Sequence, residues 1–170
     1  MNNNEISIRL SLIREGDKTA FEELYNNLKT PVYTIIHRVT WDTPMSEDIL
    51  QEVFFKLWSA PPAPSIENPR AYIFRMARNS AIDSTRKQKL NLSLDDIEVA
   101  VPDTAEELSL KMDISGALKT LPDEECQIVT LHLTGELKFR EISEIMKIPL
   151  GTVLWRYQKA IGKLRKALGG

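Results

Sequence analysis

The sequence predicts an all-α protein with two small helical domains joined by a flexible acidic linker, the second domain a helix-turn-helix. Along most of the chain, apolar residues recur every three or four positions, the spacing of one helix face. No stretch shows the alternation typical of a half-buried strand. Residues 90–105 (LNLSLDDIEVAVPDTA) are acidic and lack sustained periodicity, which favours a linker. We therefore expect domains over residues 1–89 and 106–170.

Four helices are predicted in the first domain, at residues 5–14, from Gly16-Asp17 to Val39, at 44–59 and at 69–88. Pro31 lies inside the second pattern and should kink or divide it, because proline removes a hydrogen bond and clashes with the preceding turn. Asn68 and Pro69 suit the cap and first position of the fourth helix. The Pro-rich segment 59–65 before them must be a loop.

The second domain is predicted to contain helices at 106–120 and 122–134, followed by two helical patterns around Lys147-Ile148-Pro149. A short helix, a tight turn and a longer basic helix indicate a helix-turn-helix. In that motif the second helix enters the DNA major groove and the first crosses the backbone. From Lys138 onward the sequence contains eight basic residues and only two acids. This excess of positive charge is typical of a DNA-binding segment. The same charges also fit a solvated basic face on a C-terminal helix.

The net charge of −2 conceals a segregation of charge along the 170-residue chain. Residues 70–89 are basic, residues 91–125 acidic and the C-terminal segment basic again. Two basic blocks separated by an acidic one suggest two DNA-facing surfaces.

Several function classes have no support in the sequence. No apolar run approaches the roughly 20 residues of a membrane span, and the N-terminus lacks a signal-peptide layout. With Cys126, His37 and His132 as the only cysteine and histidines, no zinc spacing occurs. There is no phosphate-binding glycine loop and no nucleophile elbow. We therefore expect no metal, no cofactor, no catalytic residue, no small-molecule substrate and no membrane insertion, and a cytoplasmic location.

Two faces of the first domain are candidate binding surfaces. Asp48, Gln51, Glu52 and Phe55 share one side of the helix at 44–59, which is either a solvated side with one stray aromatic or a docking face. The helix at 69–88 places an aromatic among basic and polar residues at helical spacing: Tyr72, Arg75, Asn79, Asp83 and Arg86. Such a face suits a single nucleic-acid strand, whose bases stack while its phosphates meet cations. A surface salt-bridge stripe is the alternative.

Four blocks in order resemble a known family. The segments GDKTAFEELYNNLKTPVYTII (16–36), SEDILQEVFFKLW (46–58), NPRAYIFRMARNSAID (68–83) and LPDEECQIVTLHLTGELKFREISEIMKIPLGTV (121–153) are similar to bacterial sigma factors of the sigma-70 family. The short chain, with two domains and a loose linker, resembles the extracytoplasmic-function (ECF) group.

This resemblance implies a factor that binds core RNA polymerase, directs promoter-specific transcription initiation and is controlled by an anti-sigma factor. The polymerase would bind Asp48, Gln51, Glu52 and Phe55. The Pro-rich loop and the next helix would open the downstream promoter element, through Arg70, Tyr72, Arg75, Asn79 and Arg86. The second domain would read the upstream element through Lys138, Arg140, Thr152, Leu154, Trp155, Arg156, Lys159 and Lys163. The linker would thread toward the polymerase active site, and the polymerase would supply all the catalysis.

Three positions depart from the family pattern. Lys147 stands in the turn where glycine is usual, so the turn must be strained or altered. Leu154 and Trp155 stand where a lysine and a small polar residue are usual. This pair could contact a thymine methyl, contact a partner protein or pack within its own domain. An alternative function is therefore a sigma-like regulator that binds polymerase or an anti-sigma partner without reading promoters. Gly162 lies inside the last helix, where it costs up to about 1 kcal/mol relative to alanine.

Overall fold

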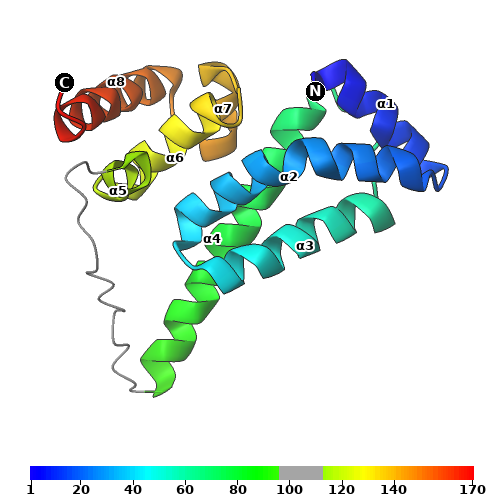
Figure 1. Ribbon diagram of the computed structural model, residues 1–170, viewed down its shortest axis with the longest axis horizontal. Helices are drawn as coiled ribbons and strands as arrows, with labels where there is room; N and C mark the ends of the chain where they lie inside the picture. Colours follow the sequence, from blue (N-terminus) through cyan, green and yellow to red (C-terminus); the bar gives the residue numbers. More distant parts are fainter. Residues whose placement is uncertain (96–112) are drawn as a thin grey trace.

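A computed structural model describes residues 1–95 and 113–170, and within these ranges the chain forms only helices. The prediction of an all-α fold is therefore confirmed for this part of the chain. The helices are α1 (Asn3–Arg14), α2 (Lys18–Thr40), α3 (Thr43–Ser59), α4 (Pro69–Asp95), α5 (Ile114–Lys119), α6 (Asp123–Leu133), α7 (Phe139–Met146) and α8 (Leu150–Ala167). Figure 1 shows α1–α4 as one group and α5–α8 as a second group beside it.

Short polar side chains fix where several helices begin. Asn2 and Glu5 form a reciprocal capping box at the start of α1. Asp17, Asp42 and Asp113 each accept a hydrogen bond from a backbone amide in the first turn of α2, α3 and α5. These contacts satisfy amide groups that have no partner within the helix.

Of the two outcomes expected at Pro31, a kink or a division of the helix, division is wrong, because α2 runs from Lys18 to Thr40 with Pro31 inside it. Buried apolar residues lie on both sides of the proline, including Leu24, Leu28 and Val32. Burying this continuous stripe stabilises one helix by more than the proline costs, since each such side chain contributes about 1.5–3 kcal/mol.

The fourth helix is longer than predicted. It continues past residue 88 to Asp95, so the start of the expected linker is helical. Residues 86–91 are exposed, and the segment Arg86–Leu90 (RKQKL) consists of strong helix formers. Intrinsic propensity therefore extends the helix after the apolar period has ended. The rest of the linker and residues 106–112 of the next predicted helix lie outside the described residues, and α5 begins at Ile114.

The two groups of helices share an apolar core. The buried cluster around Leu24, Val53 and Phe74 also contains apolar residues of the second group: Ile128, Leu131, Leu137, Ile142, Ile145 and Val153. α6 packs against α2, and α7 lies against α4. A smaller cluster within the second group holds α5, α6 and α8 together through Leu118, Leu121, Cys126, Val129 and Ala160. We call α1–α4 the N-terminal domain and α5–α8 the C-terminal domain.

Candidate protein and nucleic-acid interfaces

The outer side of α3 holds the four residues predicted to bind a protein partner. Asp48, Gln51, Glu52 and Phe55 are all exposed, and the ring of Phe55 is 66% exposed. Ile49, Val53 and Phe54 on the opposite side of α3 are buried. The helix therefore presents two acids, an amide and a large apolar ring together in solvent.

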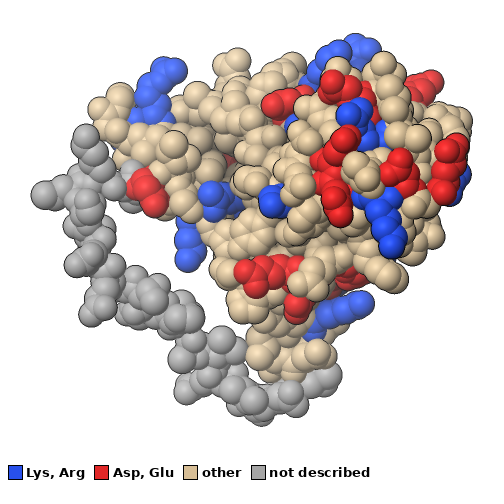
Figure 2. Space-filling model, turned by 45° about the vertical axis from the view of Figure 1, so that its right-hand side comes forward, with Lys and Arg blue, Asp and Glu red and all other residues tan. Residues whose placement is uncertain are grey.

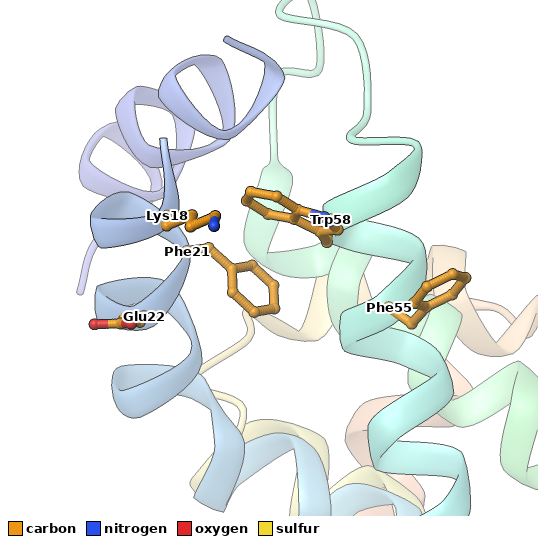
Figure 3. A pocket seen from close by; sticks show the side chains of 5 residues that line it. All are labelled: Lys18, Phe21, Glu22, Phe55 and Trp58. Carbon is orange, nitrogen blue, oxygen red and sulfur yellow. The ribbon is translucent and has the colours of Figure 1, made fainter. Parts of the chain in front are cut away.

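A groove of about 450 Å³ lies between α2 and α3 and is lined in part by Phe55. Phe21 from α2 and Trp58 from α3 point toward each other in Figure 3, with Phe55 farther along α3. The rings of Phe21 and Trp58 are 5.3 Å apart and meet edge to face, as aromatic pairs prefer. The sequence pattern did not reveal this groove, because its lining comes from the start of α2 and the end of α3, which lie far apart along the chain.

The face of α4 predicted to bind a single strand is present as a surface. Arg75, Asn79 and Arg86 are exposed, and Tyr72 is half-buried. The Arg75 guanidinium lies 5.7 Å from the centre of the Tyr72 ring, a cation–π distance. Within the described residues, no ion pair joins either arginine to Asp83. The alternative of a salt-bridge stripe is therefore not observed.

Arg70 lies apart from that surface. It is only 8% exposed, and its Nε donates a hydrogen bond to the Gly135 carbonyl oxygen at 2.7 Å. Its guanidinium also bonds to the Met1 carbonyl and lies 3.5 Å from the Glu136 carboxylate. Arg70 thus joins the two domains here, and DNA binding by Arg70 requires its release from these contacts.

Three further side-chain hydrogen bonds cross between the domains, one of them from the Asn68 amide to the Glu141 carboxylate. Arg78 Nε donates to Gln127 Oε1 at 2.7 Å, and Arg38 donates to the Ser115 hydroxyl at 2.9 Å. A groove of about 330 Å³ separates Tyr72 and Arg75 from the acids Glu141 and Glu144 of α7. The α4 face and the helix-turn-helix are therefore neighbours in this arrangement.

The Pro-rich loop between α3 and α4 is tied to the first helix. The Arg14 guanidinium donates to the carbonyl oxygens of Pro61 and Pro62. Proline carbonyls keep full acceptor capacity although the residue has no amide hydrogen. No sequence pattern predicts this tether, because 47 positions separate Arg14 from Pro61.

The turn of the predicted helix-turn-helix is formed by Lys147 in the left-handed conformation, with φ 55° and ψ 44°. Ser143 closes the turn, since its carbonyl accepts from the amides of Lys147 and Ile148 and its hydroxyl donates to the Ile148 carbonyl. The expectation of a strained turn at Lys147 is confirmed.

Three cations of α8 are paired with acids at the start of α6. Arg156 forms an ion pair with Glu124, and the carboxylate of Glu125 lies 3.8 Å from Lys159 and 2.7 Å from Lys163. Glu125 is buried, being 5% exposed. The sequence suggested only a dipole role for these acids, and the structure adds that they brace α8.

The remaining upstream-element candidates lie on or beside α8. Leu154 and Trp155 are 39% and 60% exposed, so packing within their own domain does not account for them. Lys159 Nζ is 4.7 Å from the centre of the Trp155 ring. Lys138 and Arg140 are exposed at the start of α7, and Thr152 is half-buried.

Comparison with known proteins assigns the chain to a family. Residues 24–90 match Sigma-70 region 2, and residues 117–166 match Sigma-70 region 4. The ECF RNA polymerase sigma factor SigW of Bacillus subtilis is 30% identical over 181 residues, which cover 96% of each chain. The protein belongs to the ECF sigma factors of the sigma-70 family. As such it binds core RNA polymerase and promoter DNA and directs transcription initiation.

Two solved structures have the same fold as this sigma factor. CnrH, in complex with the cytosolic domain of CnrY, matches with a TM-score of 0.68 and 18% identity, covering 96% of this chain and 97% of CnrH. RpoE of Bartonella quintana, in complex with the anti-sigma factor NepR, matches with a TM-score of 0.69 and 21% identity, covering 87% of this chain and 96% of RpoE.

Beyond these surfaces, the part of this sigma factor that the structure describes offers few other candidate binding sites. Acidic and basic side chains are interspersed over the face in Figure 2 rather than separated into large fields. Among residues 1–95 and 113–170, no cluster of three potential metal ligands occurs. In the same part of the chain, no helix has the length and apolar character of a bilayer span.

Proposed function

We propose that this sigma factor divides initiation among three surfaces, beginning with polymerase docking on α3. The observation that carries this assignment is the exposed face of Asp48, Gln51, Glu52 and Phe55 on a helix whose opposite side is buried. Its acids favour a basic partner surface. The adjoining groove at Phe21 and Trp58 accepts an apolar side chain from the same partner.

The second proposed surface opens the downstream promoter element. Tyr72 supplies a ring on which an unpaired base stacks, while Arg75, Asn79 and Arg86 meet the phosphates of the non-template strand. The Pro-rich loop, held by Arg14, precedes the helix that carries this surface. Arg70 joins it after the contacts to Gly135 and Glu136 open.

The third proposed surface is the helix-turn-helix, which places α8 in the major groove of the upstream element. Lys138 and Arg140 at the start of α7 lie where the first helix meets phosphates. Arg156, Lys159 and Lys163 add positive charge, which Glu124 and Glu125 partly neutralise. The polymerase supplies all catalytic chemistry, and the sigma factor works in the cytoplasm with it.

Control by an anti-sigma factor is part of this proposal. The related RpoE structure is a complex with an anti-sigma factor. An inhibitor that binds the α3 face or keeps the two domains packed together would block polymerase binding or DNA binding.

Transcription in vitro tests the proposal. Core polymerase with the purified sigma factor on genomic DNA should give a few defined start sites that core polymerase alone does not give. Replacing the α3 acids, as in the Asp48→Lys/Glu52→Lys variant, should abolish polymerase association while leaving the fold intact. Association at wild-type strength would contradict the α3 assignment.

The alternative function is a regulator that binds polymerase or an anti-sigma partner without reading promoters. The exposed Leu154 and Trp155 favour it, because a tryptophan buries about 150–250 Å² at an interface. Polymerase association without any start sites above core alone would support this alternative.

A further inference from the structure

The exposed side of α8 that carries Gly151, Leu154, Trp155 and Gly162, which we call the ridge, has features that bear on what this helix recognises. Leu154 and Trp155 lie in the first half of α8, 39% and 60% exposed, while Val153 and Ala160 on the inner side are fully buried. The N-terminal part of a recognition helix is the part that reaches base edges. The most exposed apolar side chains of α8 therefore occupy positions that read sequence.

The neighbouring cations do not occupy those positions. Arg156 is paired with Glu124, and Lys163 is paired with the buried carboxylate of Glu125. Lys159 lies over the Trp155 ring, with its Nζ 4.7 Å from the ring centre, a cation–π distance. Because these cations are engaged with acids, Leu154 and Trp155 are the side chains that a DNA groove would meet first at this point of the ridge.

The backbone of the ridge is also open to close approach. At Gly151 and Gly162, no heavy atom outside the adjoining residues and the backbone of the helix itself lies within 4 Å of the place where a Cβ would stand. Gly151 precedes Leu154 by about one helical turn, and Gly162 follows Trp155 by about two. A surface with small residues on either side of an apolar pair fits deep insertion into a groove.

The major groove offers one apolar group to such a pair, the C5-methyl of thymine. A leucine has no hydrogen-bonding group for guanine or cytosine edges, and a tryptophan has a single donor. We propose that Leu154 and Trp155 are specificity-determining residues that contact thymine methyl groups in the upstream promoter element. This inference rests on the proposed function of α8.

The first step of the test is selection of DNA by the reconstituted holoenzyme from a duplex library randomised over the upstream element. The wild-type protein should enrich one or two thymines at fixed positions. The Leu154→Lys/Trp155→Ser variant should lose that preference. The Trp155→Phe variant, which keeps an apolar ring, should retain it. Ile8→Lys, which changes a 49% exposed residue of α1, is the matched surface control.

The second step replaces the selected thymines by deoxyuridine, which removes only the methyl group. Wild-type binding should weaken about fourfold for each methyl lost, as burial of one methylene-sized group predicts. Binding by the double variant should not change. Thermal melting by circular dichroism checks that each variant is folded.

Any one of three results would overturn this inference while leaving the proposed function of α8 standing. The first is equal wild-type affinity for thymine and uracil duplexes, and the second is an unchanged thymine preference in the double variant. The third is loss of polymerase association by the double variant with its DNA preference intact. The last would make the pair a protein interface. Failure of the wild-type holoenzyme to enrich any upstream sequence would overturn the proposed function of α8 as well.

Discussion

Lys147 has a strained backbone conformation that the surrounding motif stabilises. Its φ of 55° is in the left-handed region, which costs a residue with a Cβ about 1–2 kcal/mol. Ile142 and Ile145 on one side of the turn and Val153 on the other are buried in the shared core. This packing, with the Ser143 hydrogen bonds, keeps the turn in place.

Replacing Lys147 by glycine should raise the free energy of unfolding by about 0.5–1 kcal/mol, because relief of the strain exceeds the entropy that glycine adds to the unfolded chain. Denaturant titration measures the change. The control Arg165→Gly, at an exposed helical position, should lower stability by about 1 kcal/mol. A destabilised Lys147→Gly variant would contradict the argument.

His37 makes stability depend on pH. Partial burial, aided by the charge of Arg38, lowers the pKa of His37 below its ordinary value of 6.5. The unfolded chain therefore binds this proton more readily than the folded chain. Stability from this group is complete above pH 6.5 and is lost as pH falls through that value toward the lowered pKa.

The His37→Gln variant should lose less stability than the wild type between pH 7.5 and pH 5.5, because glutamine does not titrate. Urea unfolding at both pH values gives the change in the free energy of unfolding for each protein. Subtracting one change from the other removes the contribution of the carboxylates, which both proteins share. Equal losses in the two proteins would show that His37 does not contribute.

At the scale of elements, the packing of α6 on α8 fixes how much positive charge the recognition helix presents. Glu125 is buried between Lys159 and Lys163, and Glu124 is paired with Arg156. An acidic first turn on one helix thus lowers the positive charge on the proposed DNA-binding face of another.

The Glu125→Gln variant should be less stable by about 1–3 kcal/mol, because it weakens charged contacts of a buried side chain. Its DNA affinity should fall more steeply with salt, by about 0.9 in the logarithmic slope for each lysine that gains a phosphate. Fluorescence anisotropy at several salt concentrations measures this slope. Asp123→Asn, in the same first turn but exposed, is the matched control and should leave the slope unchanged.

The tether between α1 and the Pro-rich loop predicts a defect confined to promoter opening. In the Arg14→Ala variant, the loop loses the charged hydrogen bonds to Pro61 and Pro62, and open-complex formation should slow about fivefold. Permanganate reactivity of the downstream element follows opening. Arg9→Ala, which removes an exposed ion pair of the same helix, should open promoters at the wild-type rate. Equal rates in both variants would exclude a role for the tether.

At the scale of the whole molecule, the two domains are held by an apolar core and by a buried arginine. The single side chain of Arg70 contacts Met1, Gly135 and Glu136. Its guanidinium also lies 5.2 Å from the centre of the Phe74 ring. The same residue is a predicted DNA contact. The packed arrangement and DNA binding through Arg70 therefore exclude each other.

Replacing Arg70 by alanine should shift the free protein toward a more expanded form, because the removed charged hydrogen bonds contribute about 1.5–3 kcal/mol each. Small-angle X-ray scattering without polymerase should show a larger radius of gyration. Gln127→Ala, which removes only the bond from Arg78, should have a smaller effect. An unchanged radius in the Arg70→Ala/Gln127→Ala double variant would show that the contacts of Arg70 and Arg78 are not what holds the domains together.

The sequence alone determined the all-α class, most helix positions, an unusual turn at Lys147 and the family, because these depend on local periodicity, capping residues and short motifs. Local patterns also placed the α3 and α4 faces on exposed sides of their helices. They failed at Pro31 and at the end of α4, where tertiary packing and helix propensity overrode the local signal.

Only the tertiary structure decided which charges are free. It buried Arg70 between the domains, paired three cations of α8 with two acids of α6 and left Leu154 and Trp155 exposed. These contacts join residues far apart in the chain, and a periodic pattern carries no information about such distances. The physical reason is that helix period fixes the side of a helix on which a residue lies, whereas packing fixes what that side meets.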